Sequence, residues 1–212
     1  MSDGLVSNVS LILGFASSGV GASVVRLAGI AGAIAGAASM AAGEWVSISA
    51  NNELVQRELR VEERELRDNA GAEEAELADI YEQNHGMSRE QARSAAAEVM
   101  LEPEAALAVH AREELGVDPA ALASPWKAAG LSLLCFLLGA FAPVVPWFAG
   151  SGTAAKVTSV AIGVVAAALI GTAIGTLAER SRWRTATRQV VILLLACGAT
   201  YVVGNLLNVT TS

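Results

Sequence analysis

Six residues in the middle of the chain carry metal-ligand groups in pairs three positions apart. The pairs are Glu62 with Glu65, Glu73 with Glu76, and His110 with Glu113. Residues three apart lie on one face of an α-helix, so each pair presents two ligand groups together. Carboxylates bind hard divalent cations, and an imidazole adds affinity for Fe²⁺, Zn²⁺ or Mn²⁺. Gathered without a cation, the carboxylates would repel one another, which raises their pKa values or favours a bound metal.

A purely structural explanation also fits these residues. Glutamate-rich amphipathic helices commonly present a solvated face, and an isolated histidine such as His110 is often a surface residue. A di-iron centre needs two Glu-x-x-His motifs on packed helices. The chain offers one candidate, Glu82-Gln-Asn-His85, at an expected helix end beside Gly86. The pairs alone leave a metal site and a solvated surface both open.

Two acidic residues, Asp3 and Glu44, lie at or in apolar stretches, where ionisable groups are costly and frequently functional. Glu44, Met40 and Gly36 follow one another at intervals of four, so they share one helical face. A thioether beside a carboxylate suits the passage of a soft-to-borderline divalent cation, and Asn8 offers a further oxygen ligand near Asp3. The alternative is that Glu44 snorkels to the membrane interface while Met40 fills space.

The composition indicates a membrane protein with one acidic segment. Of 212 residues, 53% are hydrophobic and 17% are charged, and the mean hydropathy is +0.48, whereas soluble domains carry about 25% charged residues. The net charge is −7, and every acidic residue except Asp3, Glu44 and Glu179 lies between Glu53 and Asp118. Such a segment favours cations as partners and argues against nucleic acid.

Runs of about 20 apolar residues identify transmembrane helices. We expect five, with the first marginal in length and not preceded by a cleavable signal peptide. They cover residues 5–20, 22–50, 126–148, 153–177 and 190–207. The fold class is therefore all-α: a polytopic membrane protein with a cytoplasmic helical insertion between the second and third spans. The expected domains are 1–52 and 125–212 for the spans, and 53–124 for the acidic, metal-binding insertion.

Arginines set the expected orientation. Arg180, Arg182, Arg184 and Arg188 cluster between the last two spans, and the excess of basic residues in short loops marks the cytoplasmic side. By parity, the N-terminus and the acidic insertion are also cytoplasmic, and the C-terminus lies outside.

Small residues four apart occur in the second span, Gly32 to Gly36, and in the fourth, Gly171 to Gly175. Such steps allow close helix packing within one bundle, or form a homodimer seam.

The acidic segment is expected to be helical throughout. No Pro or Gly interrupts residues 47–68, so the second span can continue as one helix, and Asn69-Ala-Gly71 should end it. A second helix over 72–83 should end at His85-Gly86. A third begins at Ser88, where Ser-Arg-Glu-Gln forms a capping box. Pro103 suits the first turn of a last helix, which runs to Gly116.

Two stretches resemble the vacuolar iron transporter family, including its bacterial members. The first is Asp3-Gly-Leu-Val-Ser-Asn8 followed by Ser39-Met-Ala-Ala-Gly-Glu44-Trp, and the second is residues 102–116. The resemblance covers nearly the whole chain. It implies a homodimer that exports Fe²⁺ from the cytoplasm by proton antiport across a cell membrane, with Mn²⁺ or Co²⁺ as further cargo. It also implies that Asp3 and Met40 lie on the pathway.

The same resemblance assigns a glutamate-rich metal site to the insertion. In ungapped register its ligands match Glu62, Glu65, Glu73, Glu76 and Glu113.

Three departures accompany this match. Some members carry an acid where this chain has Gly32 and Ala33, so Glu44 is expected to take over proton or metal handling. Methionine ligands of the last cytoplasmic helix fall on Val109 and His110, and His110 is expected to replace one. Members also have more residues before Asp-Gly, so the N-terminus looks short.

The expected function is divalent metal transport without catalysis, with metal ions, protons and the lipid bilayer as partners and no catalytic cofactor. The alternative is a membrane protein that senses or stores metal in its cytoplasmic helices without moving it.

Overall fold

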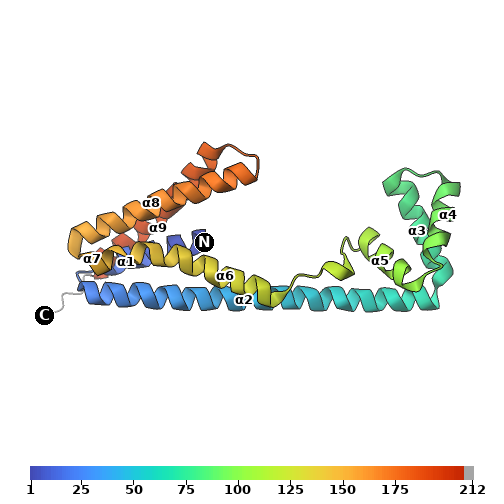
Figure 1. The fold of residues 1–212 in the computed structure, drawn as a ribbon, viewed down its shortest axis with the longest axis horizontal. Helices are drawn as coiled ribbons and strands as arrows, with labels where there is room; N and C mark the ends of the chain where they lie inside the picture. Colours follow the sequence, from blue (N-terminus) through green and yellow to red (C-terminus); the bar gives the residue numbers. More distant parts are fainter. Residues whose placement is uncertain (208–212) are drawn as a thin grey trace. The chain divides into compact units, whose positions relative to one another are not determined.

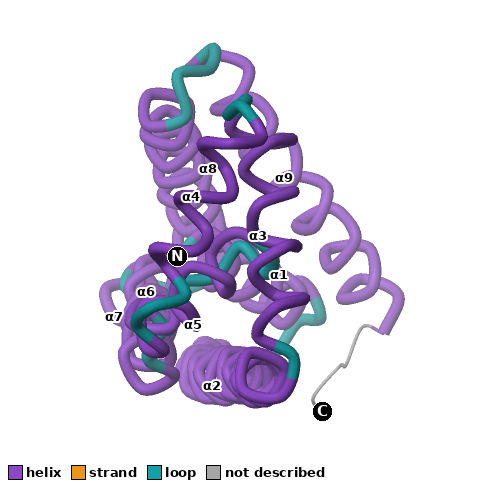
Figure 2. Tube along the Cα trace, turned by 90° about the vertical axis from the view of Figure 1, so that its right-hand side faces the viewer, coloured by secondary structure: helices purple, strands orange, loops and turns teal. Residues whose placement is uncertain are grey.

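The computed structural model describes residues 1–207 of the chain, which form helices joined by short turns (Figure 1). No β-strand occurs among these described residues (Figure 2), so the expected all-α fold is confirmed. The chain divides into two compact units. The apolar unit comprises Met1–Trp45 and the chain from Trp126 onward, and the acidic unit comprises Val46–Pro125.

Six helices and one 3₁₀ turn contribute to the apolar unit. They are α1 (Ser2–Ser17), α2 (Ala22–Asp68), α6 (Pro125–Phe141), η2 (Ala142–Val144), α7 (Pro146–Ala149), α8 (Gly152–Leu177) and α9 (Arg182–Leu207). Among the described residues, four stretches are long and apolar enough to cross a membrane: α2, Pro125–Ala149, α8 and α9. The expected first span corresponds to α1, whose 16 residues are fewer than the roughly 20 that a span normally needs. By this criterion four spans are found, where the sequence predicted five.

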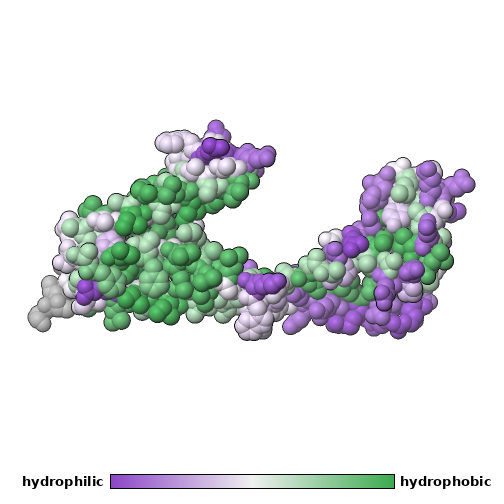
Figure 3. All heavy atoms as spheres, viewed as in Figure 1, coloured by the Kyte–Doolittle hydropathy of each residue, from purple (hydrophilic) through white to green (hydrophobic). Residues whose placement is uncertain are grey.

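Helix α1 contributes much of the core of the apolar unit. Leu5 and Val9 pack with Leu193 of α9, and Ile12 packs with Trp147 of α7. The outer faces of α8 and α9 carry exposed apolar side chains, and hydrophobic residues cover the visible body of this unit in Figure 3. An apolar exterior of this kind is what lipid requires. Seven of the 16 residues of α1 are instead buried by its neighbours.

Proline divides the third expected span. A single helix over 126–148 was predicted, but α6 ends at Phe141, and η2 and the short α7 complete the stretch. Pro143 and Pro146 lack the N–H that a continuous helix would use. The carbonyl of Pro143 is instead satisfied by the hydroxyl of Ser159, which donates to it at 2.8 Å. The Trp147 indole in turn donates to Ser159 Oγ at 3.0 Å.

Two glycines set the approach of α1 to α6. A Cβ added to Gly139 would lie 2.9 Å from the backbone nitrogen of Leu5 and still closer to the carbonyl oxygen of Met1. Gly4 meets the backbone of Phe136 in the same way. Backbone atoms cannot move aside as a flexible side chain can, so both positions require glycine.

We therefore expect Gly139→Ala to destabilise the protein in detergent by about 1–3 kcal/mol through overpacking. Gly130→Ala on the same helix is the matched control, because no atom lies within 4 Å of a Cβ there. Thermal unfolding followed by size-exclusion chromatography should show a lower midpoint for Gly139→Ala only. Equal midpoints for the two variants would contradict this packing.

The acidic unit is formed by the end of α2 with α3 (Ala70–His85), α4 (Arg89–Val99), α5 (Pro103–Glu113) and the 3₁₀ turn η1 (Pro119–Ala121). As predicted, α2 runs without a break through the end of the second span to Asp68. Only Asn69 separates it from α3, so Gly71, which was predicted as part of the break, lies inside a helix. Gly86 ends α3 with a φ of 67°.

Caps and small side chains fix the remaining helices of the acidic unit. The predicted capping box of α4 is confirmed: Gln91 N donates to Ser88 Oγ at 3.4 Å, and Ser88 N donates to Gln91 Oε1 at 3.1 Å. Pro103 begins α5, also as predicted, although α5 ends at Glu113 rather than Gly116. Ala92 and Ala96 of α4 pack against Leu77 of α3, all fully buried. Alanines at this contact let α3 and α4 lie close together.

Candidate metal centre in the acidic unit

Four potential metal ligands from three helices converge in the acidic unit. Glu62 comes from α2, Glu73 from the first turn of α3, His110 from the last turn of α5, and Glu114 caps α5. One ligand atom from each lies within 4.8 Å of all the others. The break at Asn69 allows this meeting, because α3 starts in a new direction there, and Glu73 follows Glu62 by only 11 residues in the sequence. We call these four residues the EEHE cluster.

The imidazole of His110 is at the centre of the EEHE cluster and is fully buried. Its Nδ1 lies 2.7 Å from Glu114 Oε1, 3.1 Å from Glu62 Oε1 and 3.8 Å from Glu73 Oε2. Glu62 and Glu73 are 6% and 7% exposed. One nitrogen therefore faces three carboxylates in a nearly dry environment, where electrostatic interactions are strong.

Two buried atoms of the cluster have no hydrogen-bond partner: Glu62 Oε1 and His110 Nε2. Although Glu62 Oε1 lies near His110 Nδ1, only the contact with Glu114 has hydrogen-bond geometry. An unpaired buried carboxylate oxygen is costly. A cation between the carboxylates would satisfy this oxygen and would bind Nδ1 once the ring proton moves to Nε2.

The size of the cluster suits a small transition-metal ion after a modest contraction. Ligand atoms at about 2.1 Å from one ion can be at most about 4.2 Å apart, compared with the 4.8 Å limit found here. Three carboxylate oxygens and one imidazole nitrogen form a mixed hard and borderline donor set. Such a set matches Fe²⁺, Mn²⁺, Co²⁺ or Zn²⁺ better than Ca²⁺.

Burial changes the acidity of two of the carboxyl groups. Burial, with the charge of Glu114 as the next cause, raises the pKa of Glu62 from its ordinary value of 4.5 to about 7, even though His110 acts in the opposite direction. Burial and then the charge of Glu76 raise the pKa of Glu73. Protons and metal ions must therefore compete for this site near neutral pH.

Only three of the six ligands predicted from the sequence belong to the EEHE cluster. Glu62, Glu73 and His110 meet in the cluster, whereas Glu65 and Glu76 are exposed beside it. They still act on it at a distance, since the charge of Glu65 contributes to the raised pKa of both Glu62 and Glu73.

Glu113, the sixth predicted ligand, pairs outside the cluster with His85. Its Oε2 lies 2.9 Å from His85 Nε2. The His85 ring also meets the ring of Tyr81 edge-on, with centroids 5.6 Å apart. Burial, and next the charge of Glu113, raise the pKa of Tyr81.

Glu114 was not predicted as a ligand. It lies four residues after His110, which is one helical turn, whereas the sequence argument considered only the i, i+3 partner Glu113. Counting i+4 partners as well would have found it.

The expected pathway residues belong to the apolar unit, and they differ in burial. Asp3, Met40 and Glu44 are exposed, and neither carboxylate makes a hydrogen bond or ion pair with another described residue. Asn8 is 2% exposed, and its Nδ2 donates to the carbonyls of Gly29 at 3.1 Å and Ala140 at 2.6 Å.

The amide oxygen of Asn8 is buried without a partner. A Cβ added to Gly32 would lie 3.1 Å from it, so this glycine leaves room for the Asn8 side chain. Asn8 thus joins α1, α2 and α6 through its nitrogen and presents a free oxygen toward α2.

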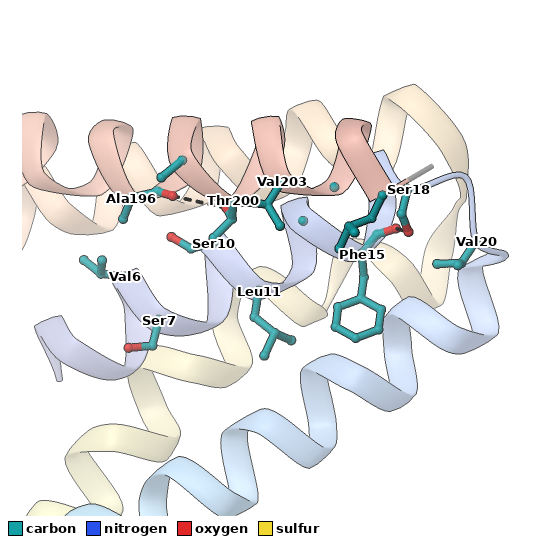
Figure 4. A pocket seen from close by; sticks show the side chains of 14 residues that line it. Val6, Ser7, Ser10, Leu11, Phe15, Ser18, Val20, Ala196, Thr200 and Val203 are labelled. Atoms are coloured by element: carbon teal, nitrogen blue, oxygen red, sulfur yellow. Dashed lines mark hydrogen bonds between the residues drawn. The ribbon is translucent and has the colours of Figure 1, made fainter. Parts of the chain in front are cut away.

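A large groove of about 700 Å³ lies between α1 and α9 in the apolar unit (Figure 4). Its hydroxyl groups are partly used within their own helices: Thr200 donates to Ala196 and Ser18 donates to Phe15, both through backbone carbonyls. None of Asp3, Asn8, Met40 or Glu44 lines it. The groove is therefore suited to apolar chains and is separate from the expected ion pathway.

We expect Glu62→Gln to stabilise the metal-free acidic unit at pH 8. A carboxyl whose folded-state pKa is raised binds its proton more tightly in the folded state, so its contribution to stability is greatest below pH 4.5 and is lost as the pH rises to about 7. The full shift in the pKa of Glu62 corresponds to a change on the order of 3 kcal/mol in the free energy of unfolding. Glutamine is neutral throughout, so hydrogen exchange of residues 70–113 should be slower than in the unaltered protein at pH 8 and similar at pH 5.

Glu53→Gln is the matched control, because this residue is exposed on the same helix and its charge is not among those that raise the pKa of Glu62 or Glu73. Faster exchange in Glu62→Gln at pH 8 would contradict the assignment of the buried charge.

Comparison with known proteins gives one consistent result. The profile of the VIT family matches residues 1–205. The chain is 28% identical over 202 residues to "Vacuolar iron transporter 2" of Oryza sativa subsp. japonica, covering 95% of this chain and 82% of that protein. It is 28% identical to "Vacuolar iron transporter 1" of Arabidopsis thaliana over 95% of this chain and 80% of the relative. It is 33% identical to "Vacuolar iron transporter" of Acanthamoeba castellanii, over 69% of this chain and 58% of the relative.

Proposed function

Because this chain belongs to the VIT family, we propose that it transports divalent transition-metal ions across a membrane, with Fe²⁺ as the main cargo and Mn²⁺ or Co²⁺ as others. The observation that carries the proposal is the EEHE cluster, in which three carboxylates surround one buried imidazole. The names of the relatives, which are iron transporters, support the choice of iron. The protein acts as a carrier and not as an enzyme.

The acidic unit collects the metal in this proposal. Its exposed glutamates raise the local cation concentration, as a field of one sign does, and the EEHE cluster holds the ion. Binding displaces the proton that Glu62 retains near pH 7, so uptake weakens as the pH falls. His110 favours borderline metals over Ca²⁺ or Mg²⁺.

Asp3, Asn8, Met40 and Glu44 form the proposed pathway through the apolar unit. Carboxylates on apolar helices are costly in lipid and frequently mark ion pathways, and the thioether of Met40 suits soft-to-borderline metals. The unpaired buried oxygen of Asn8 is available to a passing cation or to a water in its shell. A carboxylate that holds alternately a proton and a cation couples the two flows, which gives proton antiport.

The direction of transport follows from the expected orientation. With the arginine-rich turn and the acidic unit on the cytoplasmic side, metal gathered there leaves the cytoplasm, across a bacterial cell membrane. The proposal includes a homodimer.

A metal-sensing or metal-storing membrane protein is the second candidate. The buried cluster fits this function too, because metal binding by itself needs no pathway, whereas family membership and the carboxylates Asp3 and Glu44 on apolar helices favour transport. The two functions differ in flux, as tested below.

Substitutions at Glu113 and Glu114 test which of these two glutamates is a metal ligand. We expect Glu114→Gln to weaken Co²⁺ or Mn²⁺ binding at least tenfold, because one charged ligand is lost from the cluster. Glu113→Gln should change it less than threefold, because Glu113 pairs with His85. Isothermal titration calorimetry on the detergent-purified protein measures both. A larger loss in Glu113→Gln would favour the ligand set that the family resemblance implies.

Transport itself is tested in proteoliposomes. Asp3→Ala should abolish Fe²⁺ movement driven by a pH gradient, because the pathway loses its first carboxylate, while metal binding by the acidic unit is retained. Undiminished flux in this variant would remove Asp3 from the pathway. Binding without flux in the unaltered protein would favour sensing or storage.

A further inference from the structure

The turn between α8 and α9 carries a pocket that metal transport does not explain. It encloses about 330 Å³ and is lined by Arg180, Ser181, Arg184, Thr185 and Arg188. That volume is at the lower end of the roughly 300–1,000 Å³ typical of small-ligand sites. Arg184 and Arg188 are four positions apart in α9, so their side chains share one face of that helix, and Arg180 lies in the turn before it.

These arginines lack protein partners. Among the described residues, no carboxylate lies within ion-pair distance of Arg180, Arg184 or Arg188, although Glu179 is adjacent in sequence. Guanidinium groups bind phosphate oxygens through two parallel hydrogen bonds. Three such groups around one pocket therefore favour an anion with phosphate chemistry.

Close packing of α8 on α9 holds the pocket in shape. A Cβ on Gly171 would lie 2.6 Å from the Cα of Ala186, and Gly175 meets the Thr185 hydroxyl still more closely. Thr185 is buried and donates to the carbonyl of Arg182 at 3.0 Å. The Gly171–Gly175 step thus packs within one chain.

The turn itself is also well defined. Arg180 N donates to the carbonyl of Gly175 at 2.8 Å, and Glu179 adopts a φ of 50°, where a residue with a side chain is strained by about 1–2 kcal/mol. The turn retains this conformation, and as a result Arg180 is directed back beside the start of α9.

The surroundings indicate where the anion comes from. Trp183 and Leu177, on either side of the pocket, are 81% and 86% exposed. In Figure 3, hydrophilic residues cover this end of the apolar unit, directly beyond its hydrophobic body. Tryptophan at the end of an apolar helix marks the headgroup level of a bilayer. Lipid phosphates are concentrated at that level, whereas free phosphate is dilute.

We propose that Arg180, Arg184 and Arg188 form a binding site for the phosphate headgroup of an anionic membrane phospholipid. The site is independent of the EEHE cluster and of the pathway residues. Basic pockets between transmembrane helices hold such headgroups through the same contacts. The bound lipid would tie the α8–α9 turn to the bilayer surface.

The test measures lipid binding by native mass spectrometry and thermal unfolding in detergent, with added phosphatidylglycerol, phosphatidylcholine or inorganic phosphate. The unaltered protein should prefer phosphatidylglycerol. The double variant Arg184→Gln, Arg188→Gln should bind it about 30-fold more weakly, which corresponds to about 2 kcal/mol for two arginines near a membrane surface. Lys156→Gln, at the opposite end of α8, is the control and should keep the preference.

Three outcomes would overturn the proposal. The double variant could retain full preference for phosphatidylglycerol, the unaltered protein could bind both lipids equally, or inorganic phosphate could give the same stabilisation as the lipid. Both arginines are exposed, and an unchanged thermal midpoint of the double variant without added lipid checks that the protein remains folded.

Discussion

Three carboxylates that converge on one buried imidazole repel one another, and the arrangement of the acidic unit depends on how that repulsion is relieved. Glu62, Glu73 and Glu114 face the same nitrogen of His110 within 3.8 Å. A proton on Glu62 relieves part of the repulsion near neutral pH, and a divalent cation would relieve more. A proton and a divalent cation would therefore compete for the site, as the proposed proton-coupled transport requires.

Local features of the chain bring these charged groups together despite the cost. The single-residue break at Asn69 ends α2 and lets α3 leave in a new direction (Figure 1). The capping box at Ser88 and Pro103 fix where α4 and α5 begin. Because Ala92 and Ala96 have small side chains, α3 and α4 pack close together. The apolar packing of this small core thus offsets the electrostatic cost of the cluster.

The apolar unit meets the opposite constraint, since lipid tolerates no unsatisfied polar group. Helix α1 pairs part of its polar groups with neighbouring helices: the Asn8 amide nitrogen donates to carbonyls of α2 and α6, and Ser10 contacts Cys197 of α9, while the Asn8 amide oxygen has no partner. Glycine at positions 4 and 139 allows the backbones of α1 and α6 to come close enough for such bonds. The exposed ionisable residues, Asp3 and Glu44, are the exceptions that transport would explain.

The sequence by itself determined the helical class, the apolar stretches and the starts of α4 and α5, because periodicity, caps and proline act over a few residues. It also identified Glu62, Glu73 and His110 as ligand candidates through their spacing. Only the tertiary structure decided that Glu114 joins them while Glu113 turns to His85, since two neighbouring residues on a helix point about 100° apart and the packing of α5 selects between them. The same holds for the short α1, whose buried residues join the apolar core, whereas the break at Pro143 is a local effect of proline that the sequence prediction missed. Spacing along the chain defines which residues share a face, but contact between helices defines what that face meets.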